Sequence, residues 1–276
     1  NNFDQTEQDA QAQQRISSPT KPAAYVWWPA DNQAGLATLR RLSRTGVPVF
    51  QANQAVRPEA EDMVVAYAGV DDYFNGQIAG ENALAAREAF VKNGHELSGE
   101  GGNLVVLKFI PGYSAGEDRE AGFLDATKDA PFNVIATEYA GFDNASGYKA
   151  MSQLIPIIRS QGIDFVYGMS DGPVTGAVQA LEEVGMKPGE DVYLFSATCI
   201  ADISAAESAK EFATGVQSAG LEGWFAINVV ARYFEYGETV KEGTYIAPDD
   251  ADARPVFDFA PSKKNIIPNP QVVVGT

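Results

Sequence analysis

Short apolar runs alternate with amphipathic stretches along most of the chain. Residues 164–168 are rich in β-branched and aromatic side chains, which predicts a buried strand. Apolar residues then recur on one face of residues 174–185, which predicts a helix. Pro173 stands where the helix should begin, and Gly185 stands where it should end. Residues 169–172 are therefore a turn from the carboxyl end of a strand into a helix, and ligands bind at such turns in open α/β sheets.

The same alternation covers the rest of the sequence. Strands that alternate with helices at regular spacing indicate a doubly wound, mostly parallel α/β fold. The predicted helix at residues 144–161 contains Pro156, which is expected to kink it. The other predicted strands are residues 23–28, 47–51, 63–70, 104–110, 132–137, 192–196, 212–217, 244–247, 256–259 and 272–274. The other predicted helices are residues 5–16, 32–46, 72–91, 114–126, 144–161, 201–210 and 221–236.

The composition narrows the class of protein. A chain of 276 residues with 45% hydrophobic residues is ordinary for a globular protein of one large domain or two lobes. Its net charge of −17 argues against a nucleic-acid partner, which requires basic surface. The single cysteine, Cys199, and the single histidine, His95, provide neither a disulfide nor a metal cluster. We therefore expect no nucleic acid, metal or cofactor.

The turn at residues 168–172 also matches the G-x-S-x-G nucleophile elbow, with Ser170 as the nucleophile. A hydrolase of this kind needs a histidine base after the serine, and His95 lies upstream. A serine esterase is therefore the weakest interpretation. A polar turn without a ligand is a second one, and a binding turn that presents Ser170 and Asp171 to a neutral ligand is the one that we prefer.

Several motifs, in their order and spacing, resemble the sugar-binding periplasmic proteins of ABC importers, in particular the ribose-binding group. Residues 46–50, followed by Asn53 and Gln54, look like that family's strand that ends in an Asp-Arg ligand pair. Residues 70–80 look like its Asp-Asn…Gly…Ala-Gly helix start, and residues 112–123 look like its G-x-S-A…R…G-F segment. Further binding positions of the family fall at Phe142-Asp143, Ser170-Asp171, Thr198 and Gln217.

The resemblance implies the fold of a type I periplasmic binding protein, in which two doubly wound parallel-sheet lobes are joined by a hinge of three crossing strands. One lobe would hold residues 1–69 and 219–255, and the other residues 70–218 and 256–276. Members of the family begin with a strand, a helix and a second strand, and Asn1 aligns near the end of that second strand. We therefore expect that an N-terminal segment, and a leader before it, are missing from this sequence.

The candidate site combines these positions with side chains suited to a polyhydroxylated ligand. Arg119 can offer a bidentate fork to two hydroxyls, although periodicity alone would make it a solvated arginine among acidic neighbours. Trp27 and Trp28 point to opposite sides of their strand, and Trp28, nearer its end, is the stacking candidate, with Phe142 as a second. The predicted ligand-binding residues are Trp28, Asn53, Gln54, Arg119, Phe142, Ser170, Asp171, Thr198 and Gln217, with Trp27, Asp71 and Tyr113 as weaker candidates.

The sequence departs from the family pattern at several of these positions. Neutral Asn53 and Gln54 replace the charged Asp-Arg pair. Ser170 replaces the usual asparagine, and Thr198 replaces the usual aspartate. Asp71 and Asp72 are more typical of helix caps than of ligand contacts. These changes are compatible with a sugar-like ligand but do not single out ribose.

The resemblance therefore implies an exported, monomeric solute-binding protein that is not an enzyme. It would act in the periplasm or another extracytoplasmic space, free or lipid-anchored. It would capture a small neutral sugar or polyol by hinge closure and deliver it to a membrane permease. The alternative is the ligand-sensing domain of a LacI-type transcription repressor, which has the same fold. Replacing Arg119 by alanine is expected to weaken binding while leaving the fold intact.

Overall fold

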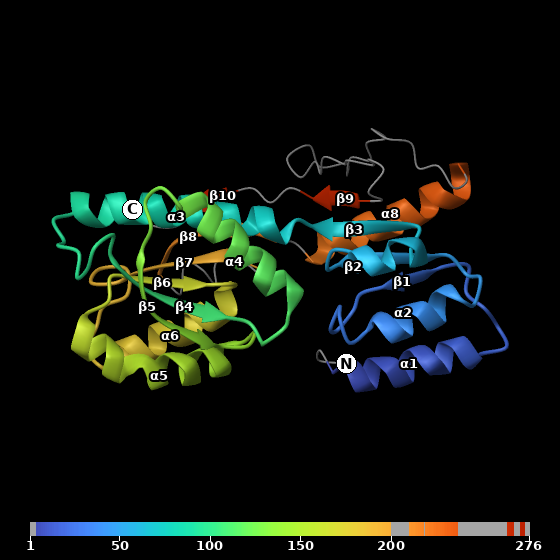
Figure 1. Cartoon of the computed structure of the whole chain (residues 1–276), viewed down its shortest axis with the longest axis horizontal. Coiled ribbons are helices and arrows are strands. Elements are labelled where there is room, and N and C mark those ends of the chain that lie inside the picture. The colour runs from blue at the N-terminus through green and yellow to red at the C-terminus, as the bar shows by residue number, and fades with distance from the viewer. Residues whose placement is uncertain (1–3, 200–209, 218, 237–263, 268–270, 274–276) are drawn as a thin grey trace. The chain divides into compact units, whose positions relative to one another are not determined.

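The computed structural model describes residues 4–199, 210–217, 219–236, 264–267 and 271–273 (Figure 1). The chain divides into two compact units. The first unit is Asn1–Asp71 with Ala219–Pro268, and the second unit is Asp72–Ser218 with Asn269–Thr276. Each unit is built from discontinuous pieces of sequence, because the chain passes from one unit to the other three times.

The first unit is a parallel sheet with helices on both faces, in the strand order β1-β2-β3-β9. Side chains alternate between the faces of a strand. On one face, Phe50 and Ala52 pack against α8, and on the other Val49 packs with residues of α1 and α2. The described elements are α1 (Gln5–Ser17), β1 (Tyr25–Trp27), α2 (Leu36–Ser43), β2 (Val49–Asn53), the 3-10 helix η1 (Pro58–Met63), β3 (Ala66–Val70), α8 (Ala219–Tyr236) and β9 (Lys264–Ile267).

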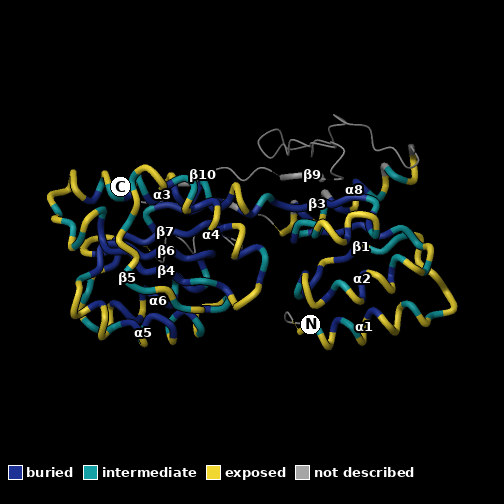
Figure 2. The backbone as a smooth tube through the Cα atoms, viewed as in Figure 1, coloured by how far each residue is buried: buried dark blue, intermediate teal, exposed yellow. Residues whose placement is uncertain are grey.

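The second unit has a larger sheet, in the order β10-β8-β7-β6-β4-β5, parallel except for β10. One face packs on α5 and α6 and the other on α3 and α4 (Figure 1). Figure 2 shows its central strands as buried. The elements are α3 (Asp72–Lys92), β4 (Asn103–Lys108), α4 (Ser114–Thr127), β5 (Asn133–Tyr139), α5 (Asn144–Gln161), β6 (Phe165–Gly168), α6 (Asp171–Glu183), β7 (Tyr193–Cys199), β8 (Glu211–Val216) and β10 (Gln271–Val273).

Two predictions about the elements differ from the structure. Helix α6 begins at Asp171 rather than at Pro173. The reason is that the first-turn N–H groups of a helix have no partner within the helix, so a proline there removes no hydrogen bond. The tail was assigned to the second lobe from residue 256, whereas β9 pairs with β3 in the first unit. The helix predicted at 201–210 and the strands predicted at 244–247 and 256–259 lie outside the described residues, apart from Lys210.

Helices α3 and α4 approach each other closely because a glycine of each helix faces the backbone of the other helix. A Cβ atom on Gly76 of α3 would lie 2.1 Å from the carbonyl oxygen of Arg119 in α4. A Cβ atom on Gly122 of α4 would lie 1.9 Å from the carbonyl oxygen of Tyr73 in α3. A real Cβ cannot approach an oxygen so closely, so this packing depends on glycine and fixes the backbone of Arg119 against the first turns of α3.

A buried carboxyl group lies between β7 and β8. Burial raises the pKa of Glu211 to about 8, although the Ser196 hydroxyl beside it acts in the opposite direction. Ser196 Oγ lies 2.6 Å from Glu211 Oε2 and 2.7 Å from Thr214 Oγ1. Thr214 Oγ1 donates to the carbonyl oxygen of Gly215. Ser196 donates to Glu211 Oε2, and burial favours the neutral form of the carboxyl group.

Replacing Gly76 by alanine should destabilise the protein, because overpacking forces the two helix backbones apart. We expect a loss of about 1–3 kcal/mol in the free energy of unfolding, measured by urea denaturation with circular dichroism. The matched control is Gly223→Ala in α8, where nothing lies within 4 Å of the added Cβ. Alanine there should leave stability unchanged or raise it by up to about 1 kcal/mol. A Gly76→Ala protein as stable as the original would contradict the close packing.

Glu211 should make the protein less stable as pH rises. Its folded pKa of about 8 is above the ordinary value of 4.5, so the folded state keeps a proton that the unfolded state releases between these values. Its contribution is fully present below pH 4.5 and falls by about 1.4 kcal/mol per pH unit until the pH passes about 8. Urea denaturation from pH 5 to 8 should show a flatter profile for Glu211→Gln than for the original protein. An exposed control, Glu190→Gln, should keep the original slope.

Candidate functional site

The carboxyl ends of β6, β7 and β8 in the second unit converge on the guanidinium of Arg119. The residue is only 3% exposed. Its Nη1 donates to Thr198 Oγ1 at 2.8 Å and to the carbonyl oxygen of Met169, and its Nη2 donates to Gln217 Oε1 at 2.8 Å. Asp72 Oδ1 lies 2.8 Å from both Nε and Nη2. Three of the predicted residues, Arg119, Thr198 and Gln217, are therefore in direct contact.

These contacts exclude the alternative interpretation of Arg119 as a solvated arginine, and they correct two expectations about it. Its fork does not stand open, because every N–H of the guanidinium has a partner within the protein. Replacing Arg119 by alanine would also not leave the fold intact. It would leave the buried carboxylate of Asp72 without its cation, which typically costs about 3–5 kcal/mol.

Ser170 and Asp171 lie at the start of α6, beside this centre. Ser170 is the N-cap residue of α6 and is fully buried, and its Oγ has no hydrogen-bond partner in the described part of the chain. Asp171 is buried, and Cys199 Sγ donates to its Oδ2 at 3.7 Å. No base among the described residues therefore contacts the Ser170 hydroxyl, and His95 is stacked on Phe90 with 4.4 Å between the ring centroids. A buried hydroxyl without a partner costs free energy, unless a ligand or water satisfies it.

Aromatic rings surround the same centre. Phe142 is half-buried and lies 4.9 Å from Phe109 and 5.2 Å from Tyr113, measured between ring centroids. The guanidinium carbon of Arg119 lies 5.1 Å from the centroid of Phe109. Phe142 and Tyr113 therefore belong to an aromatic cluster with Phe109 beside Arg119.

The first unit has its own polar centre at the carboxyl end of β2, around Gln51. This side chain is fully buried and donates to Asn32 Oδ1 at 3.3 Å and to the carbonyl oxygens of Gln54 and Ala55 at 2.8 and 3.2 Å. Gln54 is buried and donates to the carbonyl oxygen of Pro29 at 2.7 Å. The side-chain oxygens of Gln51 and Gln54 have no partner among the described residues. Two buried acceptors are thus available here for a donor that the described chain does not supply.

Asn53 is held in an unusual conformation next to this centre. Its φ is +68°, in the left-handed region that asparagine tolerates better than most residues. Its Nδ2 donates to Glu222 Oε2 at 3.0 Å, and its carbonyl oxygen accepts from Tyr67 at 2.6 Å. The end of β2 is therefore fixed by residues of β3 and α8.

The remaining predicted residues of the first unit differ in exposure. Trp27 is buried in the core, whereas Trp28 is 37% exposed, as a stacking surface requires. Asp71 is half-buried at the end of the unit.

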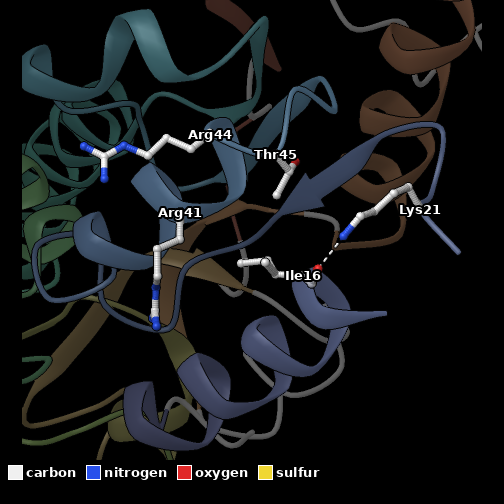
Figure 3. A pocket seen from close by; sticks show the side chains of 5 residues that line it. All are labelled: Ile16, Lys21, Arg41, Arg44 and Thr45. Atoms are coloured by element: carbon white, nitrogen blue, oxygen red, sulfur yellow. Dashed lines mark hydrogen bonds between the residues drawn. The ribbon is translucent and has the colours of Figure 1, made fainter. Parts of the chain in front are cut away.

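A hollow of about 390 Å³ lies elsewhere in the first unit, near the ends of α1 and α2. Its lining includes Lys21, Arg41 and Arg44 (Figure 3). Their charged ends point in different directions, and Lys21 is bonded to the carbonyl oxygen of Ile16. None of the predicted site residues lines this hollow. Because its charged side chains do not converge on a common point, we do not assign it as the functional site.

Sequence reasoning missed three residues of these centres. Asp72 was interpreted as a helix cap, although it is the ionic partner of Arg119. Gln51 and Asn32 were not considered. The sequence does hold a signal for Gln51, because this polar residue interrupts an otherwise apolar strand between Phe50 and Ala52. Within the described residues, no helix is long and apolar enough to cross a membrane, and no cluster of potential metal ligands is found.

Comparisons with known proteins identify the family and the fold of this chain. The sequence model of the family described as "Periplasmic binding protein domain" matches residues 1–239. The galactofuranose-binding protein YtfQ of Escherichia coli is 26% identical over 220 residues, which are 77% of this chain and 66% of that protein. The ribose import binding protein RbsB of Escherichia coli is 29% identical over 158 residues, which are 57% of this chain and 48% of that protein. The matched regions thus span 66% and 48% of the lengths of these two relatives.

The fold is also found in solved structures. The crystal structure of a galactofuranose-binding protein superposes with a TM-score of 0.74 at 20% identity, over 98% of this chain and 81% of that one. A family match over most of the sequence and a shared fold confirm the family and the α/β fold class that the motifs predicted. The chain therefore belongs to the periplasmic binding protein domain family.

Proposed function

We propose that this chain is the ligand-binding part of an ABC importer's solute-binding protein, and that it captures a small neutral sugar or polyol. The observation that carries the proposal is the centre around Arg119. It combines a buried guanidinium, the amide of Gln217 and the hydroxyls of Thr198 and Ser170 at the carboxyl ends of three adjacent strands. Ligands bind at this edge of open α/β sheets.

The chemistry of the centre suits hydroxyl groups. A sugar hydroxyl is both a donor and an acceptor, so it can satisfy the Ser170 hydroxyl. It can also replace the oxygen of Thr198 or Gln217 as a partner of Arg119. The ring of Phe142 supplies an apolar surface beside these polar groups. In the first unit, the open acceptors of Gln51 and Gln54 and the exposed ring of Trp28 offer the same combination.

Family membership supports a role in import. Related proteins bear the names of galactofuranose-binding and ribose import binding proteins. One solved relative holds L-arabinofuranose and another holds myo-inositol. By the proposal, the protein acts outside the cytoplasm and closes on its ligand. The closed form then delivers the ligand to a membrane permease without chemical change.

A thermal-shift screen tests this function. The purified protein is heated with pentoses, hexoses in furanose and pyranose forms, deoxysugars and inositols. A ligand at about 100 times its dissociation constant adds about 2.7 kcal/mol of apparent stability, which should raise the midpoint by roughly 5–10 °C. We expect this shift for one class of sugar or polyol. Absence of any shift, in protein shown to be folded and free of retained ligand, would contradict the proposal.

Replacing Ser170 by alanine should weaken ligand binding without lowering the stability of the fold. The variant removes a buried hydroxyl that has no partner, so we expect the free energy of unfolding to stay the same or to rise by about 1 kcal/mol. Affinity for the sugar identified in the screen should fall by about tenfold, because a hydrogen bond to the ligand is lost. Calorimetry and urea denaturation measure the two effects.

The matched control for this variant is Ser196→Ala. Ser196 is also fully buried, but its hydroxyl has two partners, Glu211 and Thr214. Alanine at this position should therefore destabilise the protein by about 1–3 kcal/mol and leave sugar affinity unchanged. A Ser170→Ala variant that loses stability and keeps its affinity would remove Ser170 from the site.

A further inference from the structure

The ion pair at the centre of the second unit is almost closed to water. The side chains of Arg119 and Asp72 are only 4% and 5% exposed. Asp72 Oδ1 lies 2.8 Å from both Nε and Nη2, so one carboxylate oxygen is shared by two arms of the guanidinium. A buried charge is tolerated only when it is paired and hydrogen-bonded, and this arrangement meets both conditions.

The other partners of Arg119 carry no charge. They are the carbonyl oxygen of Met169, the hydroxyl of Thr198 and the amide oxygen of Gln217. The positive charge of Arg119 is therefore balanced by Asp72 alone among its direct partners. Because Asp72 is the first residue of α3, its backbone is fixed by a helix whose first turns pack against the backbone of Arg119 at Gly76.

We propose that Asp72 is a specificity-determining positioning residue, which holds Arg119 and cancels its charge so that the site accepts neutral sugars and rejects sugar acids. The inference rests on the proposed function. A hydroxyl of a neutral ligand can replace the Thr198 hydroxyl or the Gln217 amide oxygen as a partner of Arg119. The ion pair between Arg119 and Asp72 then stays intact. A sugar carboxylate in the same place would lie near Asp72 in a buried environment, where like charges repel strongly and no cation among the direct partners described for this centre is left to compensate. With asparagine at position 72, the charge of Arg119 would be available to such a carboxylate.

Binding of paired probes to the original protein gives the first test. D-galactose and D-galacturonate share one ring and carbon skeleton and differ in charge, as do D-glucose and D-glucuronate. Isothermal titration calorimetry at pH 7 and low salt should show that the protein binds the neutral member of a pair at least about tenfold more tightly than the acid. Equal affinity for the two members of the bound pair would overturn the inference without any variant.

Three variants then test Asp72 itself. Asp72→Asn keeps the shape and removes the charge, so the affinity ratio of acid to neutral sugar should rise at least about tenfold. Asp72→Glu keeps the charge and should continue to reject acids. Asp125→Asn is the matched control, because Asp125 forms a solvent-exposed ion pair with Lys128 and its loss should leave the ratio unchanged.

The outcomes distinguish this inference from the proposed function. If the original protein binds none of the neutral sugars or polyols in the screen, the proposed function fails, and the inference fails with it. If the protein binds a neutral sugar, but Asp72→Asn weakens the binding of the neutral sugar and of its acid equally, then Asp72 is only structural. That outcome overturns the inference alone. A change in ratio that occurs equally in Asp125→Asn would be an effect of net charge and would also overturn it.

Discussion

The second unit depends on the burial of one guanidinium group. Five N–H groups in a fixed plane must all find acceptors once they are removed from water, and the fold supplies them from four separate segments. These are the start of α3, the turn after β6, the end of β7 and the residue after β8. The ends of the strands are therefore held in register around Arg119, and any ligand at this edge must exchange with contacts that the fold already makes.

Much of the fold follows from the spacing of apolar residues. The strand at Phe165–Gly168 and the helix at Asn144–Gln161 were predicted within a few residues, since each carries a strong local pattern. The pairing of β9 with β3 was not predicted. It joins residues almost two hundred positions apart, and a short strand carries no local signal of its partner.

The candidate site was harder to predict from the sequence than the fold. Arg119, Thr198 and Gln217 were placed together only through the family resemblance, because their mutual contacts join distant parts of the chain. The charge partner of Arg119 was missed for a physical reason. An aspartate at the first position of a helix is already explained by capping and by the helix dipole, so Asp72 gave no reason to seek a second role. Gln51 was missed because a single polar residue in a strand is usually assigned to the solvent face.

The glycine contact between α3 and α4 has an evolutionary consequence. Gly76 fixes the backbone of Arg119, the ion pair with Asp72 holds one side of its guanidinium, and Thr198 and Gln217 accept hydrogen bonds from the other side. Thr198 and Gln217 are then the positions at which substitution can change the pattern of donors and acceptors around a constant cation. A scaffold of this kind can acquire a new cargo by a few changes at strand ends, while its helix pairs and core remain as they were.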